Sequence, residues 1–168
     1  MYRSLALAAL CSLFLSLPTG ARAATTGLDA VLSSHDWLNG RVNASDVRGK
    51  VVLVDFYTFE CINCQHVEPN LRKLYHDTRR DDLVVIGVHS PETPFERDRS
   101  NLKASIASQS IAWPVVVDNG FGVWNAYGVS AWPTQLIFDR HGRLVKTIVG
   151  EGQDDEVDST VRELIADR

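Results

Sequence analysis

The sequence has little methionine, little cysteine and no surplus of positive charge. Its 168 residues include 1 methionine and 3 cysteines, and 17 lysines and arginines stand against 21 aspartates and glutamates. Because there is neither a basic surplus nor a basic run, the chain lacks the electrostatic footprint that nucleic-acid binding requires. The composition, 45% hydrophobic and 23% charged, is that of a globular domain, and the length suits one packed core. We therefore expect a single domain and no nucleic-acid partner.

The apolar run near the start of the chain is too short for a membrane span. It extends from Leu5 to Leu17, whereas a spanning helix needs roughly 18 apolar residues. Arg3 precedes the run and a small-x-small triplet at 21–23 follows it, which is the pattern of a secretory signal. The pattern predicts cleavage after Ala23, export to the periplasm and a mature single domain of residues 24–168. The alternative is a signal that is retained as an anchor.

Two of the cysteines form a closely spaced pair. Cys11 lies inside the signal, with Leu10 before it where a lipoprotein signal would have a small residue, so Cys11 is expected to be removed. Cys61 and Cys64 remain, three positions apart. A disulfide between them would close too small a loop to restrict the unfolded chain much, and it would stabilise the fold little. The pair is therefore better suited to redox chemistry than to structural cross-linking.

Hydrophobic periodicity predicts an α/β domain. The expected elements are a strand at 51–56, a helix over 67–75, a strand at 83–88, a surface helix at 99–109, a strand at 115–117, a hairpin of strands 134–138 and 143–149, and a helix that begins at 154–156. Residues 25–50 are interpreted as a lead-in with short strands. This order predicts a parallel sheet with an antiparallel edge and helices on both faces.

The cysteine pair falls where the first buried strand ends and the first helix begins. Unpaired backbone N–H groups and the helix dipole stabilise a thiolate at a helix N-terminus, so Cys61 is expected to be the nucleophile. Cys64, one turn inside the helix, lies on the same face and is expected to be less exposed. It can attack a mixed disulfide formed by Cys61 and release the substrate.

Metal and haem sites are alternative uses of such a pair. A zinc site needs two further ligands at compatible spacing, and His66, His76 and His89 do not form a second knuckle. Covalent haem attachment needs histidine directly after the second cysteine, where this chain has Gln65. We expect neither a metal nor a cofactor.

Several motifs together resemble those of thioredoxin-fold proteins, and more closely the exported thiol-disulfide proteins of the TlpA/ResA type and the C-terminal domain of DipZ-like proteins. The matching segments are VDFYTFECINC at 54–64, Pro69, VIGVHSPE at 85–92 and WPT at 132–134. The similarity runs from about Trp37 to the C-terminus. The resemblance implies a thioredoxin fold, with a central mixed sheet flanked by helices and a TlpA/ResA-type insertion at 90–127.

The resemblance also implies roles for residues outside the cysteine pair. Trp132 and Pro133 would be joined by a cis peptide bond, and with Thr134 they would face the cysteines and bind an extended substrate segment. Cis bonds are far less costly before proline than elsewhere. Glu92 matches a glutamate that lines the active-site cavity of ResA-like proteins.

Asp55 is a carboxylate inside an apolar strand, at a position where thioredoxins have a buried carboxylate. Burial would raise its pKa and make it a proton acceptor for Cys64. The alternative is a structural carboxylate satisfied by Lys50 or by a backbone donor. Glu60 departs from the tryptophan that thioredoxin has before the first cysteine, and a charged acid there would oppose thiolate formation.

The implied function is that of a periplasmic thiol-disulfide oxidoreductase, expected to be a monomer, that reduces disulfides of exported proteins. Its electrons would come from a membrane donor of the CcdA or DsbD kind. Apocytochrome c, a copper-site assembly protein and a methionine sulfoxide reductase are candidate substrates by resemblance, with cytochrome c biogenesis one possible setting. The reduction potential of the pair decides the direction of electron flow.

Two other functions stay open at this point. Thr58 stands three residues before Cys61, as threonine does in peroxiredoxins, although Val54 occupies the position of their proline. A thiol peroxidase is therefore one alternative. A copper-handling thioredoxin-fold protein is the other, since thiolates bind Cu(I), but no methionine follows Met1 to supply a third ligand.

Overall fold

The computed structural model describes residues 27–167 and shows a six-stranded sheet in the order β1-β4-β3-β2-β5-β6. The strands are β1 (Trp37–Leu38), β2 (Val51–Tyr57), β3 (Leu83–His89), β4 (Val115–Val117), β5 (Thr134–Phe138) and β6 (Leu144–Val149). The helices are α1 (Asp29–Leu32), α2 (Ala44–Val47), α3 (Ile62–Asp77), α4 (Arg99–Ser108), α5 (Gly122–Tyr127) and α6 (Asp154–Ala166). The predicted signal, 1–23, lies outside the described residues.

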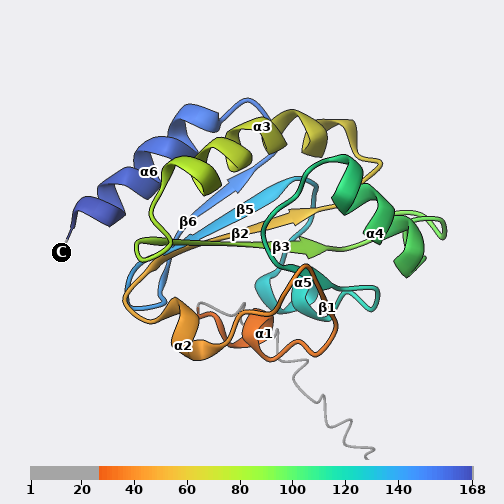
Figure 1. The fold of residues 1–168 in the computed structure, drawn as a ribbon, viewed down its shortest axis with the longest axis horizontal. Helices are drawn as coiled ribbons and strands as arrows, with labels where there is room; N and C mark the ends of the chain where they lie inside the picture. The colour runs from red at the N-terminus through yellow and green to blue at the C-terminus, as the bar shows by residue number, and fades with distance from the viewer. Residues whose placement is uncertain (1–26, 168) are drawn as a thin grey trace, which may run out of the picture.

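The sheet is mixed and its central strand is fully buried. β2, β3 and β4 run parallel to one another, whereas β5 pairs antiparallel with β2, β6 with β5, and β1 with β4. Every residue of β2 is buried, as its continuous apolar run predicted. In Figure 1, α3 and α6 cover one face of the sheet, and α1, α2 and α5 lie on the other. The predicted mixed sheet with helices on both faces is therefore confirmed.

The lead-in differs from its prediction. Only β1 is a strand within 27–50, and it has two residues; most of the regular secondary structure there is in α1 and α2. Asn43 is the N-cap residue of α2 and forms a capping box with Asp46. Reciprocal capping of this kind satisfies the free N–H groups of a first turn, so a very short helix is stable once it packs on the core. The prediction of short strands was wrong for this part of the lead-in.

Helix α5 was not predicted at all. Its backbone enters through Phe121 at φ 56° and leaves through Gly128 at φ 67°, both in the left-handed region. The Asp118 carboxylate accepts hydrogen bonds from the backbone N–H groups of Val123 (3.1 Å) and Trp124 (2.9 Å). The helix is thus capped by a side chain outside the usual N-cap position. A six-residue segment shows too little periodicity to reveal such a helix.

The fold brings two loops to one edge of the sheet. The chain leaves β2 at Tyr57 and begins α3 at Ile62, so residues 58–61 lie at the C-terminal end of β2. β5 runs the opposite way, with Thr134 paired to Phe56, so the loop before β5 emerges at that same end. In the part of the chain described, no helix is long and apolar enough to cross a bilayer.

Candidate active site

The cysteine pair lies at the N-terminus of α3, as predicted. Cys61 is the N-cap residue, and its sulfur accepts a hydrogen bond of 3.2 Å from the backbone N–H of Cys64. Both thiols are free; Cys61 is partly exposed and Cys64 is buried. The Cys61 sulfur therefore lies at the first turn of α3, where a backbone N–H group points at it.

Cys64 lies in an environment that opposes ionisation of its thiol. Burial raises the pKa of its thiol well above the usual range, and a hydrogen bond with Cys61 and the nearby Asp55 raise it further, against a smaller lowering by the Thr58 backbone. A thiol in this environment does not ionise by itself near neutral pH. Cys64 therefore needs a proton acceptor before it can attack a disulfide.

Asp55 has the properties of such an acceptor. Its side chain is buried, and burial raises its pKa to about 7; an interaction with Gln135 lowers the pKa and the charge of Glu68 raises it. Its Oδ1 atom has no hydrogen-bond partner. Among residues 27–167, no ion pair joins it to Lys50. The structure therefore gives no support to the alternative in which Lys50 satisfies this carboxylate.

The predicted substrate loop also lies at this edge. The Trp132–Pro133 peptide bond is cis, as expected. The Trp132 indole donates a 3.0 Å hydrogen bond to the Ser90 carbonyl, and the Thr134 hydroxyl donates one of 2.7 Å to the Ala131 carbonyl. Trp132 and Cys61 both pack against the same apolar cluster. The structure thus fixes this loop on the side of the sheet where the cysteines lie, while its contact with a substrate stays a prediction.

Glu92 and Glu96 differ sharply in environment. The Glu92 side chain is exposed, whereas Glu96, which the sequence analysis did not single out, is 1% exposed. The Glu96 carboxylate accepts hydrogen bonds from the Thr58 hydroxyl and from the backbone N–H groups of Glu60 (3.0 Å), Glu92 (2.8 Å) and Thr93 (2.8 Å). The structure shows Glu92 pointing to solvent; a cavity role for it stays a prediction.

Glu96 connects the loop that leads to Cys61 with the insertion. Burial opposes its ionisation, but the hydrogen bonds from Thr58, Glu60, Thr93 and Glu92 outweigh burial and hold its pKa below the usual range. A sequence signal for it existed: Thr93 and Glu96 have the T-x-x-E spacing of a capping box, and the Glu96 N–H does bond to the Thr93 hydroxyl at 3.3 Å. The partner across the fold, Thr58, could not be found from spacing.

His89 and His66 lie in different environments. His89 ends β3 and is completely buried; its ring stacks on Phe59 at 5.4 Å, and burial lowers its pKa to about 4. His66 is exposed on the first turns of α3 and pairs with Glu151. No group of three or more metal-ligating side chains occurs among the residues that the structure describes.

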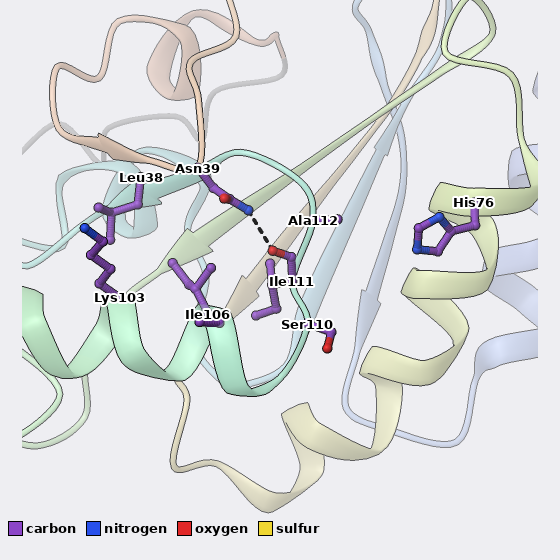
Figure 2. Close-up of a pocket in the computed structure, with 9 residues that line it drawn as sticks. Leu38, Asn39, His76, Lys103, Ile106, Ser110, Ile111 and Ala112 are labelled. Atoms are coloured by element: carbon purple, nitrogen blue, oxygen red, sulfur yellow. Dashed lines mark hydrogen bonds between the residues drawn. The ribbon is translucent and has the colours of Figure 1, made fainter.

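A surface pocket lies away from the cysteines. It has a volume of about 510 Å³. Figure 2 shows its lining residues between α4, β1 and the chain that follows α4. Leu38, Ile106 and Ile111 line it, and His76 stands at its rim. His76 belongs to the last turn of α3, whereas Cys61 caps the first turn, so the pocket and the cysteines are at opposite ends of that helix. The pocket contains neither cysteine.

A mixed sheet, a cis-proline loop and a dithiol at a helix N-terminus together define a thioredoxin-like dithiol protein. The chain belongs to the AhpC/TSA family, whose model matches residues 23–147. It is 35% identical over 135 residues to Protein DipZ of Mycobacterium tuberculosis, a match that covers 78% of this chain and 19% of DipZ. The chain thus spans about a fifth of the length of that relative.

Two further comparisons cover most of both proteins. The thiol-disulfide oxidoreductase ResA of Halalkalibacterium halodurans is 27% identical over 145 residues, which cover 86% of this chain and 78% of ResA. The crystal structure of a thiol-disulfide isomerase from Corynebacterium glutamicum superposes with a TM-score of 0.72 at 25% identity, covering 80% of this chain and 93% of that one. These findings confirm the predicted fold and the predicted resemblance to DipZ-like and ResA-type proteins.

Proposed function

We propose that the protein is a periplasmic thiol-disulfide oxidoreductase that reduces disulfides of exported proteins. The observation that carries the proposal is the arrangement of the two sulfurs: a partly exposed Cys61 at the N-terminus of α3, hydrogen-bonded by the Cys64 N–H at 3.2 Å, with the Cys64 thiol buried behind it. The names of the ResA and isomerase relatives support the same chemistry. Export and cleavage after Ala23, leaving 24–168 as one monomeric domain, complete the proposal.

The reaction takes place in two exchanges at sulfur. The Cys61 thiolate attacks a substrate disulfide, forms a mixed disulfide and releases one substrate thiolate. Asp55 then takes the proton of Cys64, and the new Cys64 thiolate attacks the Cys61 sulfur. The mixed disulfide breaks, the second substrate thiolate leaves, and a Cys61–Cys64 disulfide remains. Two electrons pass to the substrate, and a dithiol donor of the CcdA or DsbD kind restores them.

The surface around Cys61 suits an extended protein segment. Ile62, between the cysteines, is 59% exposed, and Phe95, from the insertion, is 56% exposed. Phe95 packs edge-on against Phe59 at 5.9 Å, just before the cysteine pair. Apolar side chains at these positions would contact a substrate chain that the 132–134 loop holds in place.

Replacing Cys64 by serine is expected to trap mixed disulfides with natural partners through Cys61. The resolving thiol is then absent, so the intermediate cannot be released. Non-reducing gels of periplasmic extracts, followed by mass spectrometry of the reducible adducts, measure the trapping. Cys61→Ser is the matched control and should trap nothing. Better trapping by Cys61→Ser would reverse the two roles, and no adduct with either variant would contradict the proposed function.

The Cys61–Cys64 pair is expected to be reducing, with a potential nearer the thioredoxin value of about −270 mV than the DsbA value of about −120 mV. A strong oxidant needs a greatly stabilised thiolate, and neighbouring cations are one source of that stabilisation. Arg97 donates to the Asn119 carbonyl at 2.6 Å, and Arg99 pairs with Asp36, so both arginines of the insertion are engaged with groups other than Cys61. Equilibration with glutathione buffers, read by alkylation mass shifts, measures the potential. A DsbA-like value would contradict the reductant assignment.

A thiol peroxidase is the second candidate, favoured by the match to the AhpC/TSA family model. Its threonine would be Thr58, but that side chain is completely buried and its hydroxyl donates to Glu96. The Thr58 hydroxyl is thus engaged in a hydrogen bond within the loop that precedes the cysteines. Consumption of hydrogen peroxide by the reduced protein, far faster than by free cysteine, would favour this candidate over the disulfide reductase.

A further inference from the structure

Four proton-bearing side chains meet between β2 and α3. Asp55 and Tyr57 alternate on one strand, so they point to the same face of the sheet. Cys64 and Glu68 are one turn apart on the buried side of α3. Tyr57 and Cys64 belong to one apolar cluster, which identifies that face as the one that α3 covers. The interface therefore holds the resolving thiol, its proposed base and a second carboxylate, Glu68.

Glu68 has only part of the hydrogen bonding that a structural carboxylate needs. It is 5% exposed, and its Oε2 atom accepts from Arg72 at 3.3 Å. Its Oε1 atom has no partner, and neither do Asp55 Oδ1 and Tyr57 Oη. Buried polar atoms are nearly always paired, and leaving them unpaired costs stability. An open carboxylate oxygen on the same side of α3 as Cys64 thus points to a role in proton movement.

The charges at this interface couple the two carboxyl groups. Burial raises the pKa of Glu68, and Arg72 lowers it. The charge of Glu68 in turn raises the pKa of Asp55. Burial raises the pKa of Tyr57 well above its usual range, with Asp55, Glu68 and Cys64 adding to the effect. Glu68 thus acts on Asp55 through its charge, since a negative charge beside a buried carboxyl group opposes its ionisation.

The other elements packed here add few charges. β3 places Gly87 beside Asp55 and ends in His89, which is neutral at pH 7 because burial lowers its pKa to about 4. β5 contributes the uncharged Gln135, opposite Asp55. The residues of α6 that are buried, Val157 and Val161, are apolar. Its Asp158 is part-exposed and pairs with Arg162 at 3.7 Å, and its Asp154 is part-exposed. At the N-terminus of α3, the Cys61 sulfur accepts a hydrogen bond from the Cys64 N–H, and on the far side Arg72 also donates to the Gln109 carbonyl.

We propose that Glu68 is a positioning residue that shares one proton with Asp55. It carries this proton away from Asp55, toward the side of the interface where Arg72 lies. The inference rests on the proposed function, in which Cys64 resolves a mixed disulfide. In that step the Cys64 proton goes to the Asp55 carboxylate and the Cys64 electron pair forms the bond to Cys61. The proton then passes to Glu68, whose Arg72 partner is part-exposed, and from there to water. Asp55 is left ionised for the next cycle.

The direct test is a carbon-13 NMR titration of the side-chain carboxyl groups in the reduced protein. In the wild type, Asp55 Cγ and Glu68 Cδ should titrate in two shared steps, one of them near pH 7. Glu68→Gln should move the midpoint of Asp55 down by about 0.5–1 pH unit, because a neighbouring negative charge is lost. Glu163→Gln, at an exposed position of α6, is the matched control and should leave it unchanged. Independent single-step curves in the wild type would overturn the inference without any variant.

A kinetic test separates this inference from the proposed function. The pH midpoint for release of a mixed disulfide should fall in Glu68→Gln by the same amount as the NMR midpoint, and in Asp55→Asn the Glu68 change should have no further effect. An equal effect in both backgrounds would reduce Glu68 to a structural residue. Failure of the wild type to exchange any protein disulfide would contradict the proposed function, whatever the titration shows.

Discussion

Asp55→Asn is expected to slow release of the mixed disulfide by about 100-fold at neutral pH, the lower end of what a positioned general base contributes. The first attack by Cys61 should keep its rate, because it needs no base beside Cys64. Burial raises the pKa of Asp55 to about 7, so in the wild type the release rate should rise with pH through about 7. In the variant this rise should disappear, because asparagine accepts no proton. Stopped-flow measurement of each exchange step, across a pH series, resolves the two rates.

A matched control distinguishes the loss of a base from the loss of a charge. Asp81→Asn removes a carboxylate whose side chain is 82% exposed, and it should change neither step. If Asp55→Asn slowed attack and release equally, Asp55 would be a structural residue and the proton path to Cys64 would have to be sought elsewhere.

Asp55→Asn should also alter the pH dependence of the protein's stability. The unfolded chain releases the Asp55 proton near 3.8, whereas the folded protein holds it up to about 7. Folding therefore binds a proton between these values, and wild-type stability falls as pH rises through them. Relative to the wild type, Asp55→Asn should gain up to about 4 kcal/mol of unfolding free energy between pH 4 and pH 8. Urea unfolding of the reduced proteins measures the difference; a gap that did not vary with pH would contradict the raised pKa.

Glu96→Ala is expected to destabilise the reduced protein by about 2–4 kcal/mol, because the Thr58 hydroxyl and three backbone N–H groups would lose their acceptor. Thr58 and Glu60 lead directly into Cys61, so the variant should also slow the first attack on a substrate. Urea unfolding and the rate of mixed-disulfide formation are the two measurements.

Glu92→Ala is the matched control for this loss, since it removes an exposed carboxylate from the same loop. It should change stability by no more than about 0.5 kcal/mol. The pKa of Glu96 is lowered in the folded state, so its contribution is complete above about 4.5 and is lost as pH falls through the lowered value. The difference in unfolding free energy between the wild type and Glu96→Ala should therefore become smaller in acid. A gap that persisted undiminished in acid would mean that the charge of Glu96 is not what stabilises the loop.

The placement of the cysteine pair illustrates what local sequence predicts well. Three-residue spacing at a strand-to-helix junction predicted that Cys64 would be less exposed than Cys61, and the structure shows a partly exposed Cys61 and a buried Cys64. The burial of Asp55 followed in the same way, because its neighbours in β2 form a continuous apolar run. In each case the deciding contacts lie within one strand or one helical turn, so the periodicity of the sequence already contains them.

Tertiary structure decided the features that join distant segments. Glu96 meets Thr58 across 38 positions of sequence, and no local pattern selects it over the exposed Glu92. Helix α5 depends on capping by Asp118, and the pairing of Thr134 with Phe56 depends on the antiparallel placement of β5. The sequence by itself therefore determined the fold class, the position of the cysteine pair and the burial of Asp55, since these follow from local periodicity. Only packing could place the acceptor of the Thr58 hydroxyl and bring the charge of Glu68 close enough to act on Asp55, because hydrogen bonds and electrostatic coupling depend on distances in space rather than along the chain.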